Sequence, residues 1–189
     1  MLPNNIEALR NYFAQVSLID SGVGRIQAAL ERFGFDENTV LIYTSDHEFS
    51  LEHNGVWGHG AAAFPTSAHR PSYHIPLIVL GGAVVENTVC DTMVSQIDLF
   101  PTLAALAAAQ HARPRRPSNA RDLGPALRGD VLEWGDVVFC EQEETRAIQT
   151  SDWLYPMRYH GAVSYPMGDA LYALSDNPEE KVNLIENPE

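Results

Sequence analysis

An aspartate and a histidine stand side by side at the end of an apolar run, in the stretch "TVLIYTSDHEFSLEHNGVWGHG" of residues 39–60. Residues 39–45 predict a strand that is apolar on both faces, and Asp46 and His47 follow it directly. In open α/β sheets, ligands bind beyond the carboxyl ends of strands. A carboxylate oxygen and an imidazole nitrogen suit several divalent cations. The pair is therefore a candidate metal site; the alternative is an aspartate that caps a turn beside an uninvolved histidine.

A long amphipathic helix precedes this strand. Apolar residues recur at spacings of three and four between Ile6 and Phe33, and Gly34 is placed to end the helix. A second buried strand is predicted in "HIPLIVLG", residues 74–81. A helix followed by two strands of this kind predicts a layered α/β fold, and strands that are apolar on both faces are typical of a parallel sheet.

The remaining segments predict a smaller second part. A long loop from Glu48 to Ser72 is of a length that is usually functional. The run "VSQIDLFPTLAALAAAQ" predicts a helix that Asp98 can cap, and the polar segment after it, from His111 to Arg121, predicts a solvated loop. Short β-type runs then predict a small antiparallel sheet, and the tail "NPEEKVNLIENPE" predicts a turn and a short helix. We therefore expect domains at residues 1–112 and 136–189, joined by a linker at 113–135.

Composition limits the classes of function. The chain has 25 acidic and 12 basic residues, a net charge of −13, which argues against a nucleic-acid-binding surface. It contains no apolar stretch near the ~20 residues that a membrane span needs. The N-terminus lacks a signal-peptide layout, so a soluble chain without membrane spans is expected, cytoplasmic as given. Cys90 and Cys140 fit no disulfide or zinc pattern, and reduced cysteines are the default.

Residues 12–60 resemble the sulfatase family of the alkaline phosphatase superfamily. In that family a helix of the form Y-x-A-x(5)-D-x-x-V-G-R leads to a strand ending in T-S-D-H-G, followed by E-H-G-x-W-x-K. Later segments resemble the family in the same order: "IPLIVLGG", "VSQIDLFPTLAALA", "RAIQTSDWLY" and "ALYALSDNPEEKVNLIENPE". The resemblance implies part of an alkaline-phosphatase-like layered α/β sheet, followed by a small antiparallel C-terminal β subdomain with a short helix.

The resemblance also implies roles for three residues. Asp46 and His47 match the family's metal-binding aspartate and its Asn/His partner, so a divalent metal, with calcium as the first expectation, is implied there. His59 stands where many sulfatases carry a lysine that contacts the sulfate, which implies a catalytic contact. Two departures follow from these matches: Glu48 replaces a glycine beside the metal, and the permanent cation of lysine becomes a group that titrates.

A third departure concerns the nucleophile. Sulfatases use a cysteine of a C-x-P-x-R motif, converted to formylglycine, and neither Cys90 in "VCDTM" nor Cys140 in "FCEQE" matches it. Two further metal-binding aspartates of the family have no counterpart. We therefore expect the C-terminal part of a larger hydrolase that needs the missing N-terminal half of the same polypeptide, and a chain that alone does not turn over a small-molecule or carbohydrate sulfate ester.

Two alternatives stay open. A relative that cleaves phosphate diesters or phosphonates is compatible with the Asp-His pair and with the nonlysine at position 59. A noncatalytic binding remnant is favoured by Glu48 and by the absent nucleophile. The sequence does not discriminate among these substrates.

Overall fold

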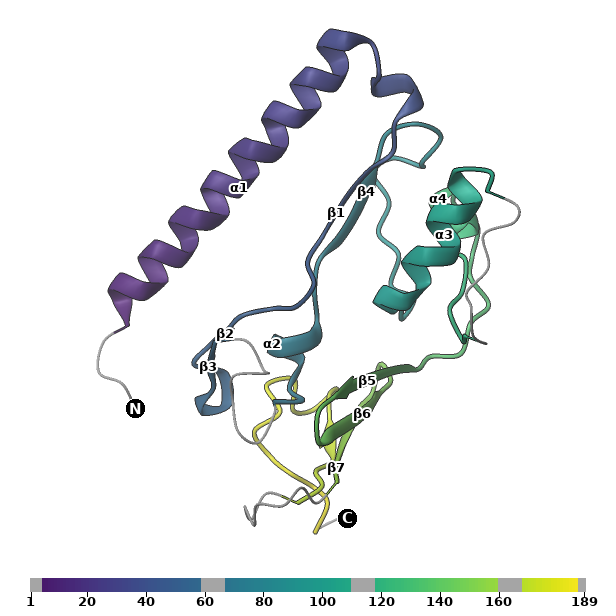
Figure 1. Ribbon diagram of the computed structural model, residues 1–189. Helices are drawn as coiled ribbons and strands as arrows, with labels where there is room; N and C mark the ends of the chain where they lie inside the picture. Colours follow the sequence, from purple (N-terminus) through teal and green to yellow (C-terminus); the bar gives the residue numbers. More distant parts are fainter. Residues whose placement is uncertain (1–4, 59–66, 110–117, 160–167, 187–189) are drawn as a thin grey trace. The chain divides into compact units, whose positions relative to one another are not determined.

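The computed structural model describes residues 5–58, 67–109, 118–159 and 168–186 (Figure 1). The chain divides into two compact units. The first unit comprises residues 1–44 and 76–86, and the second unit comprises residues 45–75 and 87–189. The boundaries expected at 112 and 135 stay predictions.

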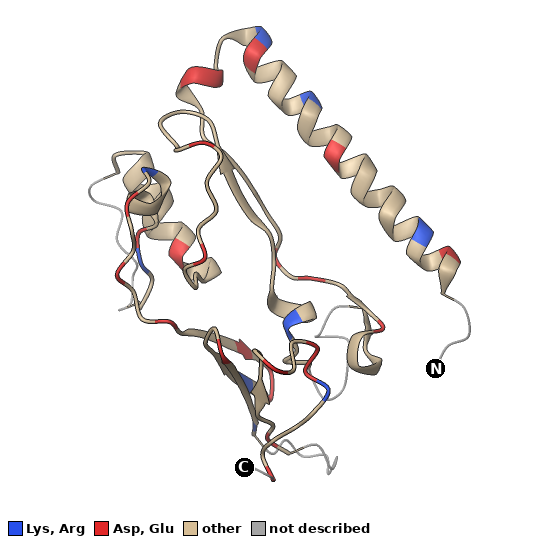
Figure 2. Ribbon diagram, turned by 180° about the vertical axis from the view of Figure 1, so that it is seen from behind, with Lys and Arg blue, Asp and Glu red and all other residues tan. Residues whose placement is uncertain are grey.

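A single long helix dominates the first unit. Helix α1 spans Ile6–Phe33, as the apolar spacing predicts. Gly34 adopts the left-handed conformation (φ 69°, ψ 32°), and its N–H donates to the carbonyl of Glu31, so the predicted glycine cap is confirmed. No residue of α1 is buried, and Leu18 is 73% exposed. Acidic and basic residues alternate along this helix (Figure 2).

Two short strands complete the first unit, after the 3-10 turn η1 at Asp36–Asn38. Strand β1 (Leu41–Thr44) pairs with β4 (Leu77–Leu80), with Leu41 opposite Leu80. The pairing is antiparallel, so the expectation of a parallel arrangement is wrong for these strands. An apolar run indicates that a strand is buried, but it does not determine whether the strand runs parallel or antiparallel to its neighbour. Gly81 follows β4 at φ +87°, where an added Cβ would lie 2.5 Å from the carbonyl oxygen of Thr39.

Short elements make up the first half of the second unit. They are β2 (Ser50–Leu51), η2 (His53–Gly55), β3 (Trp57–Gly58), α2 (Arg70–Tyr73), η4 (Gln96–Asp98), α3 (Leu99–Leu106) and α4 (Gly124–Leu127). Strands β2 and β3 pair antiparallel. The long loop expected from Glu48 to Ser72 thus contains regular structure in its described residues. No helix of the described chain is both long enough and apolar enough to cross a membrane.

Asp98 is a fully buried carboxylate at the start of α3. Its Oδ2 accepts the backbone N–H of Ser95 at 2.9 Å, which closes a capping box around η4 instead of capping α3 as expected. The backbone N–H of Arg121 donates to Oδ1 at 2.7 Å, and the guanidinium of Arg121 lies 3.2 Å from Oδ2. A buried carboxylate needs such partners. Arg121, the last residue of the segment expected to be a solvated loop, is therefore held by Asp98. Residues 111–117 of that segment lie outside the described ranges.

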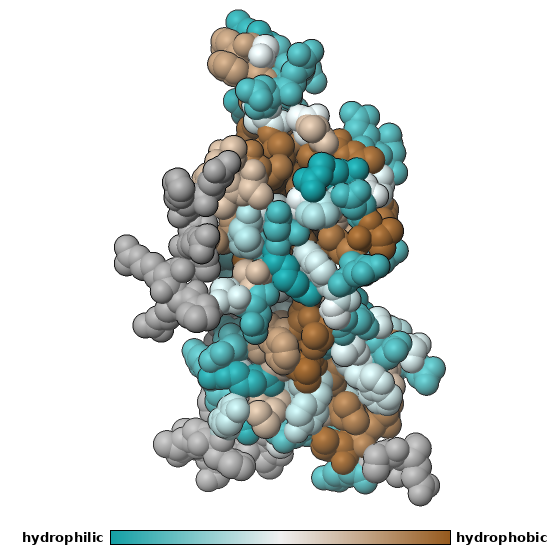
Figure 3. All heavy atoms as spheres, turned by 90° about the vertical axis from the view of Figure 1, so that its right-hand side faces the viewer, coloured by the Kyte–Doolittle hydropathy of each residue, from teal (hydrophilic) through white to brown (hydrophobic). Residues whose placement is uncertain are grey.

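A four-stranded sheet carries the core of the second unit. Strands β5 (Val138–Gln142), β6 (Thr145–Gln149), β7 (Trp153–Arg158) and β8 (Tyr172–Ala173) pair in this order, all antiparallel, which confirms the small antiparallel sheet. Buried apolar residues form one cluster: Ala68, Ala147, Leu154, Ala170, Tyr172 and Leu174. Other large apolar side chains remain at the surface of the described part (Figure 3), among them Phe139 with 67% exposure.

The tail differs from its prediction in one detail. Residues 174–186 form turns and no helix, in contrast to the expected short helix. The Oδ1 of Asn177 accepts the N–H of Lys181 at 2.9 Å, and the Oδ1 of Asn183 accepts the N–H of Leu171 at 2.9 Å. Asparagine side chains that bond backbone groups in this way compete with helix formation. Residues 187–189 lie outside the described ranges.

Candidate functional site

Asp46 and His47 lie in a tight turn just after the last residue of β1. The side chain of Asp46 is 87% exposed and that of His47 is 51% exposed. The Oδ1 of Asp46 accepts the backbone N–H of His47 at 3.1 Å, and the hydroxyl of Ser45 donates to the carbonyl of His47 at 2.7 Å. Gln96 donates from its side-chain amide to the carbonyl of Ser45 at 2.8 Å. Asp46 therefore caps its turn with one carboxylate oxygen.

The other carboxylate oxygen faces the imidazole. The Oδ2 of Asp46 lies 3.9 Å from the Nε2 of His47. The Nδ1 of His47 lies 3.0 Å from the carbonyl oxygen of Glu48, which can only accept, so Nδ1 donates and the neutral ring carries its lone pair on Nε2. Metal–ligand bonds of about 2.0–2.6 Å let one cation reach two donors at this separation. The pair fits two positions of a metal's coordination shell.

No third histidine, cysteine, aspartate or glutamate of the described chain joins this pair. Within residues 5–58, 67–109, 118–159 and 168–186, no group of three or more histidine, cysteine, aspartate or glutamate side chains could hold a metal. Calcium takes about 6–8 oxygen ligands. Asp46 and His47 therefore fit part of a calcium site, and its other ligands would have to be carbonyl oxygens, water or groups outside the described residues.

His59, the predicted sulfate contact, lies outside the described residues, so its role stays a prediction. The structure does describe Trp57 and Gly58 of β3, which precede it. Trp57 packs edge-on against Phe49, with ring centroids 6.1 Å apart. Cys90 is exposed and Cys140 is half-buried, both as free thiols. Burial raises the pKa of the Cys140 thiol.

Sequence reasoning missed a hollow of mixed polar and apolar lining in the second unit. The hollow measures about 250 Å³, and its lining residues are His53, Arg70, Pro71, His74, Pro178 and Glu179. These residues come from η2, from α2 and its C-terminal end, and from the C-terminal tail. The sequence holds no signal for this grouping, because more than a hundred residues separate the two segments that meet.

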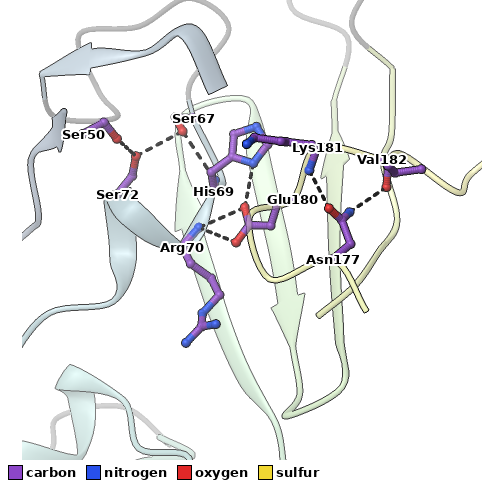
Figure 4. Close-up of polar contacts among 9 residues, drawn as sticks. All are labelled: Ser50, Ser67, His69, Arg70, Ser72, Asn177, Glu180, Lys181 and Val182. Carbon is purple, nitrogen blue, oxygen red and sulfur yellow. Dashed lines mark hydrogen bonds and ion pairs between the residues drawn. The ribbon is translucent and has the colours of Figure 1, made fainter. Parts of the chain in front are cut away.

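A buried carboxylate joins those two segments (Figure 4). The side chain of Glu180 is 1% exposed, and its Oε2 lies 2.6 Å from the Nδ1 of His69. The backbone N–H of Arg70 lies 3.0 Å from Oε1 and 3.2 Å from Oε2. Asn177 fixes the turn that carries Glu180, because its side chain accepts from the N–H of Lys181 and donates to the carbonyl of Val182. Start and end of the second unit are thus tied together.

Comparisons with known proteins agree on one family. A family model described as Sulfatase matches residues 3–109. Arylsulfatase K of Canis lupus familiaris is 34% identical over 196 residues, which cover 95% of this chain and 34% of that protein. Choline-sulfatase of Rhizobium meliloti (strain 1021) is 28% identical over 185 residues, covering 95% of this chain and 33% of that protein. The chain thus spans about a third of the length of the curated relatives it matches.

Solved structures show the same fold. One, described in work on the metabolism of multiple glycosaminoglycans by Bacteroides thetaiotaomicron, matches with a TM-score of 0.77 at 22% identity and covers 99% of this chain and 41% of that chain. Another, a 2-O GAG sulfatase, matches with a TM-score of 0.71 at 24% identity and covers 90% of this chain and 36% of that chain. The expected α/β fold class is confirmed.

Proposed function

This chain belongs to the sulfatase family, and on that premise we propose that it is the C-terminal part of a hydrolase that cleaves sulfate esters with a divalent metal. The metal of this proposal is calcium. The nucleophile of the proposal is a formylglycine that lies upstream in the same polypeptide, since neither Cys90 nor Cys140 stands in a C-x-P-x-R motif. The observation that carries the proposal is the match over residues 3–109, which contains Asp46, His47 and His59.

The geometry of the Asp-His pair supports the metal part of the proposal. Asp46 offers Oδ2 and His47 offers Nε2, and the two donors stand 3.9 Å apart on one turn. The hydrogen bond from Nδ1 of His47 to the carbonyl of Glu48 holds the ring in the form that binds a cation. A bound divalent ion would neutralise the ester's negative charge and orient the nucleophile. His59 would donate a hydrogen bond to a sulfate oxygen.

The substrate class rests on the relatives. Arylsulfatase K and choline-sulfatase are both named for sulfate esters, which favours a sulfate ester over a phosphate diester or a phosphonate for this chain. We propose a small-molecule or carbohydrate sulfate ester as the substrate.

The first test is the intact mass of the protein expressed from its native locus. We expect a species much heavier than the 20.9 kDa of this chain, because the proposal requires an upstream half. A mass of 20.9 kDa, with no second chain copurifying, would overturn the catalytic proposal in favour of a noncatalytic binding remnant.

The second test replaces Asp46 with alanine in the native protein. We expect hydrolysis of an aryl sulfate to be abolished and calcium affinity, measured by calorimetric titration, to fall at least about tenfold. Asp36→Ala is the matched control, because it removes the same charge from an exposed position in η1. Activity within a few-fold of the parent for Asp46→Ala would show that the metal is held elsewhere.

A further inference from the structure

Arg70 has an unusual position beside the buried carboxylate of Glu180. Arginine beside a buried carboxylate commonly pairs with it through the guanidinium, in a two-pronged contact. Here Arg70 uses its backbone N–H for both carboxylate oxygens, and the Nδ1 of His69 lies within hydrogen-bond distance of Oε2, at 2.6 Å. The side chain of Arg70 turns away from Glu180 (Figure 4). Glu180 is therefore satisfied without the guanidinium.

The guanidinium of Arg70 instead lines the hollow. Its Nε is buried and has no hydrogen-bond partner among the residues that the structure describes. One terminal nitrogen lies 3.5 Å from the Nδ1 of His74, a long contact at the limit of hydrogen bonding. A buried donor that lacks a partner costs about 1–3 kcal/mol. Burial closes Nε to solvent, so the terminal nitrogens of the guanidinium are the groups through which Arg70 can donate to a ligand in the hollow.

The other polar groups of the hollow are consistent with an anionic ligand. His53 and His74 both line it, and each imidazole can donate a hydrogen bond. When Nδ1 of His74 accepts from Arg70, the neutral ring carries its hydrogen on Nε2 and can donate from there. The one carboxylate in the lining, Glu179, is paired with Lys181, which offsets its charge. Arg70, Glu179 and Lys181 together carry a charge of +1, in a chain whose net charge is −13.

We propose that Arg70, His53 and His74 form a binding site for an oxyanion group, such as a sulfate, phosphate or carboxylate. The hollow of about 250 Å³ has room for one such group with several waters, since a water occupies about 30 Å³. The anion accepts from the terminal N–H groups of Arg70 and from the two imidazoles. This site does not depend on the proposed function, because it contains none of Asp46, His47 and His59.

The test titrates the full chain with inorganic sulfate and follows the Nε–Hε signal of Arg70 in nitrogen–proton NMR spectra. We expect a saturable shift of this signal with a dissociation constant in the millimolar range. Arg70→Ala lacks the Nε–Hε signal, so its titration is followed by the backbone amide signals of the residues that line the hollow. We expect its affinity for sulfate to fall at least about tenfold, because a charge-assisted contact is lost. The backbone N–H that holds Glu180 remains in this variant, so the fold around the hollow is kept.

Two controls keep the result specific. Arg32→Ala on α1 removes the same charge outside the hollow, and it leaves sulfate affinity within about twofold of the parent. His74→Ala removes a second donor and weakens sulfate binding several-fold. An absent shift in the parent up to about 100 mM sulfate, or equal affinity in the parent and Arg70→Ala, would overturn the site.

A second arm identifies the source of the anion. Glucose 6-sulfate replaces inorganic sulfate in the same titration. Tighter binding of the sugar sulfate, lost in Arg70→Ala, assigns the hollow to an anionic group on a larger molecule. Equal binding of both probes, again lost in Arg70→Ala, assigns it to a free anion.

Discussion

Helix α1 and the four-stranded sheet β5–β8 use apolar residues in opposite ways. Along α1 the apolar stripe is regular over 28 residues, yet none of these residues is buried. The sheet consists of short strands, yet it encloses Leu154 at 2% exposure and Leu174 at 5%. The sheet therefore carries its own core, whereas α1 gains none from the described chain.

This difference concerns what stabilises each region. Most helical stability in proteins comes from packing of an amphipathic face and less from propensity. The stripe of α1, with Phe13 at 60% exposure and Ile26 at 52%, is a packing surface without a buried contact among the described residues. Under the proposed function, the upstream half of the polypeptide would cover this stripe. The sheet needs no such cover for its core.

The largest expected effect comes from a matched pair of leucines. Leu154→Ala should lower the free energy of unfolding by about 3 kcal/mol, because it removes a fully buried side chain and leaves a cavity. Leu18→Ala should change it by less than about 0.5 kcal/mol, because Leu18 is 73% exposed on α1. Urea unfolding followed by intrinsic fluorescence measures both. Equal losses for the two variants would break the comparison and place α1 in the cooperative core.

A second prediction asks whether the core of the sheet extends to α2. Tyr73 packs against the buried cluster, and its hydroxyl donates to the Oε1 of Gln142 at 3.0 Å. Burial, followed by the nearby Cys140 and Glu144, raises the pKa of Tyr73 to about 12. The folded state thus favours the neutral phenol, so this stabilisation is present below the unfolded pKa of about 10 and is lost as the pH rises toward 12.

The measurement compares the parent with Tyr73→Phe. Urea midpoints between about pH 9 and pH 11 should fall more steeply for the parent, because only the parent has this phenol to ionise on unfolding. The difference between the two proteins at pH 7 serves as the internal control, since it contains the lost hydrogen bond alone. Parallel curves across the range would show that Tyr73 is not part of the buried core.

The sequence predicts the helices and strands whose formation depends on residues close together in the chain. The spacing of apolar residues and the glycine at position 34 were sufficient for α1 and its end, because both depend on neighbours within a few residues. The short β-type runs after residue 136 were sufficient for the antiparallel sheet. The direction of β1 relative to β4 was not accessible, since an apolar run carries no information on direction.

Long-range partners were equally inaccessible. The sequence predicts that Asp98 caps a helix. Its contacts with Arg121 depend instead on the folded path that brings the later segment back to Asp98. The hollow at Arg70 depends on Glu180, which is 110 residues away in the chain. For the candidate metal site, the sequence points to Asp46 and His47, which lie together with facing donor atoms. The roles of these two residues and of His59 stay predictions.

The smallest expected effect comes from two glycines of the helical region. Gly24 lies inside α1, where an added Cβ meets no atom within 4 Å, so Gly24→Ala should increase helix stability by about 0.5–1 kcal/mol. Gly34 lies at φ +69°, so Gly34→Ala should reduce it by about 1 kcal/mol through left-handed strain. Thermal melts followed by far-ultraviolet circular dichroism measure both. If α1 is stabilised separately, the melting temperature of the helical signal rises for Gly24→Ala and falls for Gly34→Ala. The melting temperature of the sheet, followed by fluorescence, then stays unchanged in both variants. If the fluorescence transition moved together with the helical signal, α1 and the sheet would unfold as one cooperative unit, and exposure of the stripe would not mark a separately stabilised region.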